Sequence, residues 1–183
     1  MNHGHSTSVK KYLLQLSEEI VDLSNVLESA GTQEGNQKVH ASVSRLRGIG
    51  DELVDHLELT SGDDLAFVQF MMGSVCSLLG FWGNAEKSYR QALDHWPDHI
   101  GILNELFDAL VAQRKYDQAE NIIIKSMKYG GETPPILRNY AAILVHQKKL
   151  NEAKVVMFNC LAKFPDDRES RGFLEKLELS SRC

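Results

Sequence analysis

A repeat with a period of 34 residues is the sequence feature that most constrains how this chain can fold. When residues 66–99, 100–133 and 134–167 are aligned, one column holds only alanine: Ala85, Ala119 and Ala153. Two later columns hold large apolar and then small residues: Tyr89, Ile123 and Met157, followed by Ala92, Ser126 and Cys160. A fixed period that keeps small and large residues in register is typical of a solenoid of stacked units. The sequence therefore predicts an all-α fold built around three helix pairs.

The aligned columns resemble the tetratricopeptide repeat (TPR), a helix–turn–helix unit of the same length. The matching residues are Gly73, Ala85, Tyr89, Ala92 and Pro97 in the first repeat and Tyr140, Ala141, Ala153, Cys160 and Pro165 in the third. The second repeat departs from the pattern, because Phe107 is bulky where a small residue is usual, Ser126 replaces alanine and Gly131 replaces proline. The resemblance covers 102 of the 183 residues. It implies a right-handed α-solenoid of three TPR helix pairs but says little about function, because this fold serves many unrelated partners.

Two runs of apolar residues with heptad spacing precede the repeats and predict an N-terminal helical hairpin over residues 9–62. The seams are Leu13, Leu16, Ile20, Leu23 and Leu27 in the first helix and Val39, Val43, Leu46, Leu53 and Leu57 in the second, with Gly50 in the vacant position. Residues 30–36, with two glycines, are expected to separate the helices. The two seams either bury each other and cap the first repeat, or bury a second copy and form a homodimer through residues 9–60.

The remaining boundaries follow from short polar turns. We expect a disordered tail at residues 1–8, the three repeats at 63–167, and a C-terminal capping helix and tail at 168–183. Ser61 and Asp64 have the spacing of a capping box for the first repeat helix. The predicted repeat helices are 64–79 and 85–95, 98–113 and 116–128, and 135–147 and 150–163.

Composition and charge exclude several classes of function. Residues 1–65 carry five Lys/Arg and eleven Asp/Glu, whereas residues 66–183 carry fifteen and fourteen, so neither part is basic. Nucleic-acid binding needs phosphate neutralisation and is not expected. No apolar run reaches the ~18 residues that span a bilayer, and the N-terminus lacks a secretory signal, so we expect no membrane insertion. Three widely spaced cysteines indicate a reducing, cytoplasmic location.

A search for catalytic groups gives no persuasive constellation. The chain lacks a phosphate-binding loop and paired-cysteine metal spacing. We therefore expect no enzyme activity, no cofactor and no metal site.

The TPR resemblance instead implies a concave groove, lined by the first helix of each pair, that holds an extended or helical segment of another protein. Mapping that face onto this sequence gives Phe67, Phe70, Ser74 and Leu78 from the first repeat, Asn104, Asp108 and Val111 from the second, and Arg138, Ala142, Val145 and His146 from the third. We expect Phe67 and Phe70 to form an apolar anchor and Arg138 a polar contact, because aromatic and arginine side chains are frequent hot spots. The alternative is that both phenylalanines pack under the N-terminal hairpin.

Members of the family that bind acidic C-termini of heat-shock chaperones use a lysine, asparagine and arginine clamp. The matching positions here are Phe70, Ser74, Glu105, Pro135 and Asn139, of which only Asn139 is suitable, so we do not expect that ligand. The size, charge and layout also resemble type III secretion chaperones that hold translocator subunits. The sequence therefore predicts a non-catalytic protein-interaction scaffold, with a secretion chaperone or a structural oligomerisation module as alternatives.

Overall fold

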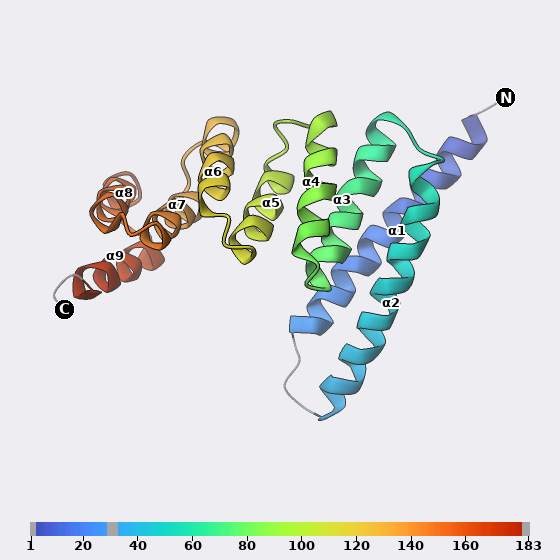
Figure 1. Cartoon of the computed structure of the whole chain (residues 1–183), viewed down its shortest axis with the longest axis horizontal. Coiled ribbons are helices and arrows are strands. Elements are labelled where there is room, and N and C mark those ends of the chain that lie inside the picture. Colours follow the sequence, from blue (N-terminus) through green and yellow to red (C-terminus); the bar gives the residue numbers. More distant parts are fainter. Residues whose placement is uncertain (1–2, 29–32, 181–183) are drawn as a thin grey trace. The chain divides into compact units, whose positions relative to one another are not determined.

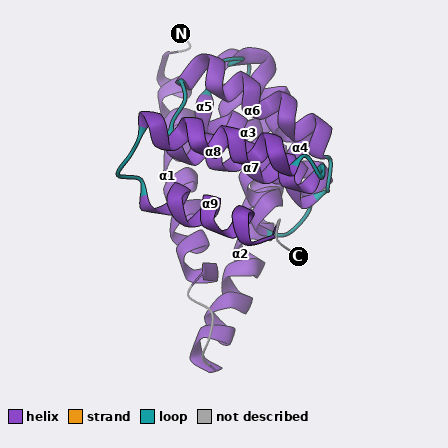
Figure 2. Cartoon of the chain, turned by 90° about the vertical axis from the view of Figure 1, so that its left-hand side faces the viewer, coloured by secondary structure: helices purple, strands orange, loops and turns teal. Residues whose placement is uncertain are grey.

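The computed structural model describes residues 3–28 and 33–180, which form nine α-helices and contain no strand (Figures 1 and 2). The helices are α1 (His3–Glu28), α2 (Gln33–Leu57), α3 (Gly62–Leu78), α4 (Trp82–His95), α5 (Ile100–Ala112), α6 (Tyr116–Gly130), α7 (Pro134–His146), α8 (Leu150–Lys163) and α9 (Arg168–Ser180). This is the all-α architecture that the repeat predicted. The chain divides into two compact units, Met1–Pro97 with α1–α4 and Asp98–Cys183 with α5–α9, called unit 1 and unit 2 below.

In unit 1, the seam of the α1–α2 hairpin is buried against α3. The shared core contains Leu13, Leu16 and Ile20 from α1, Leu46, Ile49 and Leu53 from α2, and Val68, Met71 and Val75 from α3. Gly50 lies on the face of α2 that approaches α3, since a Cβ there would be 3.7 Å from Val75 Cγ1. The hairpin therefore covers the first repeat helix, as the capping interpretation requires, while the homodimer stays a prediction.

The α3–α4 pair depends on one close approach. A Cβ on Gly73 would lie 2.9 Å from Cζ of Tyr89 and nearer still to other ring carbons. Tyr89 is fully buried, and its hydroxyl lies 3.2 Å from Ser77 Oγ. The Tyr89 ring therefore occupies the space that a side chain at residue 73 would fill.

In unit 2, α6 packs against α7, so the second and third repeats stack. The bulky Phe107 is accommodated in the α5–α6 pair, where it and Ile123 are both buried. α9 closes the other end as a capping helix, with Leu174 and Leu177 in a core that also contains Leu144 and Met157.

The turn inside each repeat has a left-handed residue at the same position. These residues are Gly80 (φ 78°), Arg114 (φ 59°) and Lys148 (φ 64°), which are spaced by the repeat period. The period is therefore preserved in the backbone even where the residue type changes.

Several predicted boundaries need correction. Residues 3–8, expected to be a disordered tail, belong to α1, because a helix nucleated by the seam extends with one hydrogen bond per added residue. α2 begins at Gln33 and includes Gly35, so the predicted break is shorter, and residues 29–32 lie outside the described part of the chain. Ser61 is the N-cap of α3, but its side chain makes no capping hydrogen bond, so the predicted capping box does not form.

Candidate partner-binding surface

The predicted groove residues of unit 1 lie on α3 and are largely engaged in packing. Phe67 and Leu78 are half-buried and pack against the core shared with the hairpin. The ring of Phe70 is tilted against that of Tyr89, with centroids 6.2 Å apart. Ser74 Oγ donates a hydrogen bond to the Phe70 carbonyl oxygen. Both phenylalanines therefore have packing partners within unit 1, and their role as an aromatic anchor stays a prediction.

In unit 2, α5 buries one side and exposes the other. Ile102, Leu106 and Leu110 are buried on the inner side, because they recur at helical spacing. Among the predicted groove residues, Asn104 and Asp108 are exposed and Val111 is half-buried. Asn104 Oδ1 accepts a hydrogen bond of 3.4 Å from Ser126 Oγ, which links α5 to α6.

Asp108 has an unusual electrostatic setting for an exposed carboxylate. Partial desolvation by the surrounding protein, followed by the negative charge of Glu105, raises the pKa of the Asp108 carboxyl. Asp108 is exposed, so this pKa shift reflects the protein crowded around the carboxyl and not full burial. Asp108 has no ion pair among the described residues. A cation on a binding partner would favour the ionised carboxylate and so oppose both the desolvation and the repulsion by Glu105.

The end of α7 is fixed against the beginning of α6. The rings of Tyr116 and His146 are stacked, with centroids 4.6 Å apart and planes 5° from parallel. Gln147 Nε2 donates to Asp117 Oδ1 at 3.0 Å and to Glu120 Oε2 at 2.8 Å. These contacts hold the exposed Val145 and His146, and the half-buried Ala142 lies one turn earlier on α7.

Arg138 does not present the free polar contact that the resemblance implied. Its Nη1 lies 2.7 Å from Asp167 Oδ2, its Nη2 lies 2.5 Å from Glu169 Oε2, and its side chain is 18% exposed. Hydrogen bonds from Ser170 and then the Arg138 charge lower the pKa of the Asp167 carboxyl. Arg138 thus positions α9 and is neutralised by it.

Sequence reasoning missed Tyr116 and the glutamine that follows His146. Both residues have counterparts in the repeat alignment, since Tyr116 stands one period after Trp82 and Gln147 one period after Gln113.

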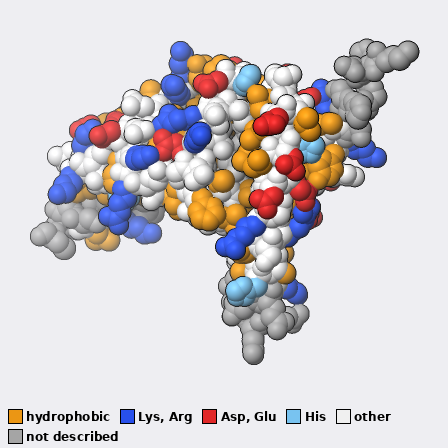
Figure 3. Space-filling model, turned by 45° about the vertical axis from the view of Figure 1, so that its right-hand side comes forward, with side chains coloured by type: hydrophobic (Ala, Val, Ile, Leu, Met, Phe, Trp, Pro, Cys, Tyr) orange, Lys and Arg blue, Asp and Glu red, His pale blue; other side chains and the backbone are white. Residues whose placement is uncertain are grey.

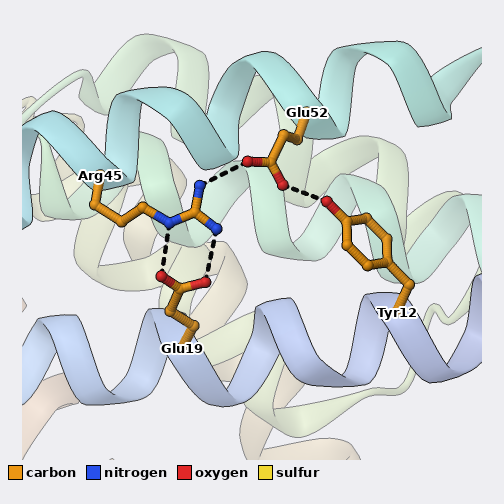
Figure 4. Close-up of polar contacts among 4 residues, drawn as sticks. All are labelled: Tyr12, Glu19, Arg45 and Glu52. Atoms are coloured by element: carbon orange, nitrogen blue, oxygen red, sulfur yellow. Dashed lines mark hydrogen bonds and ion pairs between the residues drawn. The ribbon is translucent and has the colours of Figure 1, made fainter.

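A second charged cluster joins α1 to α2 in unit 1 (Figure 4). Arg45 donates to both Glu19 oxygens, at 2.6 and 2.8 Å, and to Glu52 Oε1 at 2.6 Å. Tyr12 Oη donates to the other Glu52 oxygen. The hydrogen bonds from Arg45 lower the pKa of Glu19, those from Tyr12 and Arg45 lower that of Glu52, and the bond to Glu52 raises that of Tyr12. Arg45 bridges both carboxylates, one from each helix, and so links α1 to α2 at this position of the hairpin.

The described residues do not suggest a catalytic or metal site. They contain no group of three or more His, Cys, Asp or Glu side chains that could hold a metal ion. Cys160 is buried beside Ser170, and burial raises the pKa of the Cys76 thiol, which disfavours a reactive thiolate. No helix in the described ranges is long and apolar enough to cross a membrane.

The surface drawn in Figure 3 carries acidic, basic and hydrophobic side chains mixed together. On the described part of that face they do not form the continuous basic stripe that nucleic acid requires.

Comparison with known proteins supports the fold. No family model matches the chain, and no curated protein matches it. Among solved structures, it is similar to the first TPR of Spaghetti (RPAP3), bound to the HSP90 peptide SRMEEVD. The TM-score is 0.55 and the identity 19%, over 64% of this chain and 96% of that one. At this identity the likeness shows a TPR-like helical fold and nothing about the ligand of this chain.

Proposed function

We propose that this chain is a non-catalytic interaction module that binds a segment of another protein on the first helices of its repeats. The proposal rests on the solvent-exposed sides of α5 and α7. There the fold leaves Val145 and His146 exposed and Val111 and Ala142 half-buried, on helices whose other sides are core. The structural neighbour supports the proposal, because that TPR holds a peptide.

Unit 2 is the better candidate for the contact. The aromatic residues of α3 already pack against the hairpin core and Tyr89. Interface anchors need side chains that are free to enter a partner. We therefore place the main contact on α5 and α7, and the groove residues of α3 stay a prediction.

The partner differs from the acidic peptide of the neighbour. Glu105 is exposed on α5 at one of the positions where a clamp needs a neutral or basic group. Arg138 on α7 already has two carboxylate partners. A carboxylate-rich tail would therefore meet negative charge without a compensating cation on these helices.

The test is a selection of displayed random dodecapeptides on the full chain, followed by binding measurements with the selected peptides. Val145→Glu places a charge on α7, and Val155→Glu is the matched control on α8, where the side chain is 57% exposed. We expect Val145→Glu to weaken binding about tenfold or more and Val155→Glu to leave it unchanged, with both variants as helical as the parent by circular dichroism. Equal binding by the parent and Val145→Glu would refute the proposed surface.

The other functional expectations stay predictions. The repeats do follow a helical extension, the layout that suggested a secretion chaperone, but the neighbour described above is not of that kind. Free thiols at Cys76 and Cys160 fit a reducing compartment such as the cytoplasm, which we retain as the expected location.

A further inference from the structure

The charges of α5 and α7 are one-sided. Between Ile100 and Ala112, the only charged side chains are Glu105 and Asp108. The one arginine of α7, Arg138, is held by Asp167, which precedes α9, and by Glu169 in the first turn of α9. Neither helix therefore offers a cation to Asp108, which is exposed and has no ion pair among the described residues.

An aromatic pair in unit 2 follows Asp108 closely in the sequence. One helical turn after Asp108, α5 ends at Ala112, and a tight turn leads to Tyr116. Backbone hydrogen bonds close that turn, from Arg114 N to Val111 O and from Lys115 N to Leu110 O, both 2.9 Å. Tyr116 then stacks on His146, beside the exposed Val145.

We propose that this acid–aromatic surface, formed by Asp108, Ala112, Tyr116, Val145 and His146, selects a partner segment that carries arginine next to an aliphatic residue. Guanidinium pairs with a carboxylate and stacks on aromatic rings, whereas lysine does only the first well. The aliphatic neighbour contacts Val145. The inference rests on the proposed function and adds the chemistry of the partner. The partner segment would be basic, whereas the peptide SRMEEVD of the structural neighbour is acidic.

The experiment uses the peptides selected by the full chain and measures their amino-acid composition and their affinity for variants of Asp108. In their composition, we expect arginine to be enriched over aspartate and glutamate. The variant Asp108→Asn removes the negative charge of the side chain and keeps its shape. We expect about fivefold weaker binding for Asp108→Asn and about tenfold or more for Asp108→Arg. Glu175→Gln, an exposed carboxylate on α9, is the control and should leave binding unchanged.

The outcomes separate this inference from the function on which it rests. Peptides that are acidic or uncharged, or that bind Asp108→Asn as tightly as the parent, would overturn the arginine preference. If those peptides still lose binding in Val145→Glu, the proposed function stands. If no selected peptide depends on Val145, both the proposed function and the arginine preference fall. Binding that weakens as salt rises, with arginine-rich peptides and dependence on Asp108, supports the inference.

Discussion

At the scale of single residues, the close approach of α3 and α4 depends on Gly73, because the Tyr89 ring occupies the space of a side chain there. Gly73→Ala should lower the free energy of unfolding by about 1–3 kcal/mol, since overpacking a filled core forces neighbours to shift. Gly172→Ala on α9 is the matched control, because a Cβ there meets nothing within 4 Å, and it should be neutral or stabilising by up to ~1 kcal/mol. Urea unfolding of both variants measures the difference, and equal effects would contradict the packing account.

The left-handed turn residues give a prediction of opposite sign. Arg114 and Lys148 have φ of 59° and 64°, a conformation that strains a residue with a Cβ. Arg114→Gly and Lys148→Gly should therefore each raise the free energy of unfolding by up to about 1 kcal/mol. Lys125→Gly, inside α6, should lower it by about 1 kcal/mol. Thermal unfolding of the three variants distinguishes these signs, and destabilisation by all three would show that the turns carry no strain.

At the scale of elements, the Arg45 cluster makes the stability of the hairpin depend on pH. The folded pKa values of Glu19 and Glu52 lie below their ordinary values, so their contribution is present at neutral pH and is lost as pH falls from about 5 through the folded pKa values. Arg45→Met should cost about 1 kcal/mol at pH 7, because these side chains are more than a third exposed or close to it. The gap between parent and variant should shrink at pH 3. An equal gap at both pH values in urea unfolding would refute the cluster's role.

The attachment of α9 depends on a second arginine. Arg138 binds Asp167, which also accepts a hydrogen bond of 2.8 Å from the backbone N–H of Ser170 in the first turn of α9. Arg138→Met should therefore speed amide hydrogen exchange in α9 while leaving α3 and α4 of unit 1 unchanged. Faster exchange throughout the chain would mean that Arg138 stabilises much more than this helix, and unchanged exchange in α9 would mean that the ion pairs do not hold it.

Helix boundaries show how far local sequence patterns reach. α8 begins and ends where its pattern predicted, at Leu150 and Lys163. α4 begins at Trp82, three residues before the predicted start at Ala85, and therefore includes Gly83 and Asn84. The Phe81 carbonyl oxygen accepts hydrogen bonds of 3.0 Å from the N–H groups of Asn84 and Ala85, so the first helical turn is already formed there. Backbone bonding outweighed the weak helix preference of those residues.

At the scale of the whole molecule, the repeat period predicted the helix pairs because small and large residues must alternate wherever two helices pack. The candidate surface was harder to predict, since exposure depends on contacts that are distant in sequence. Arg138 forms an ion pair with a carboxylate 29 residues later, and Phe67 packs against a core that includes residues of the hairpin preceding the repeats. Tyr116 and His146 meet only once α6 and α7 are packed. Local periodicity carries no information about such pairs.

The central claim is that a partner segment binds on the outer side of α5 and α7. The most direct measurement is NMR of the isotopically labelled full chain, titrated with a peptide selected from the random library. We expect the largest chemical-shift changes on α5, the start of α6 and the end of α7, including Asp108 and Val145. At the same peptide concentration, we expect these changes to be much smaller in Val145→Glu. Changes confined to α8 or to the α1–α2 hairpin, persisting in Val145→Glu, would contradict it.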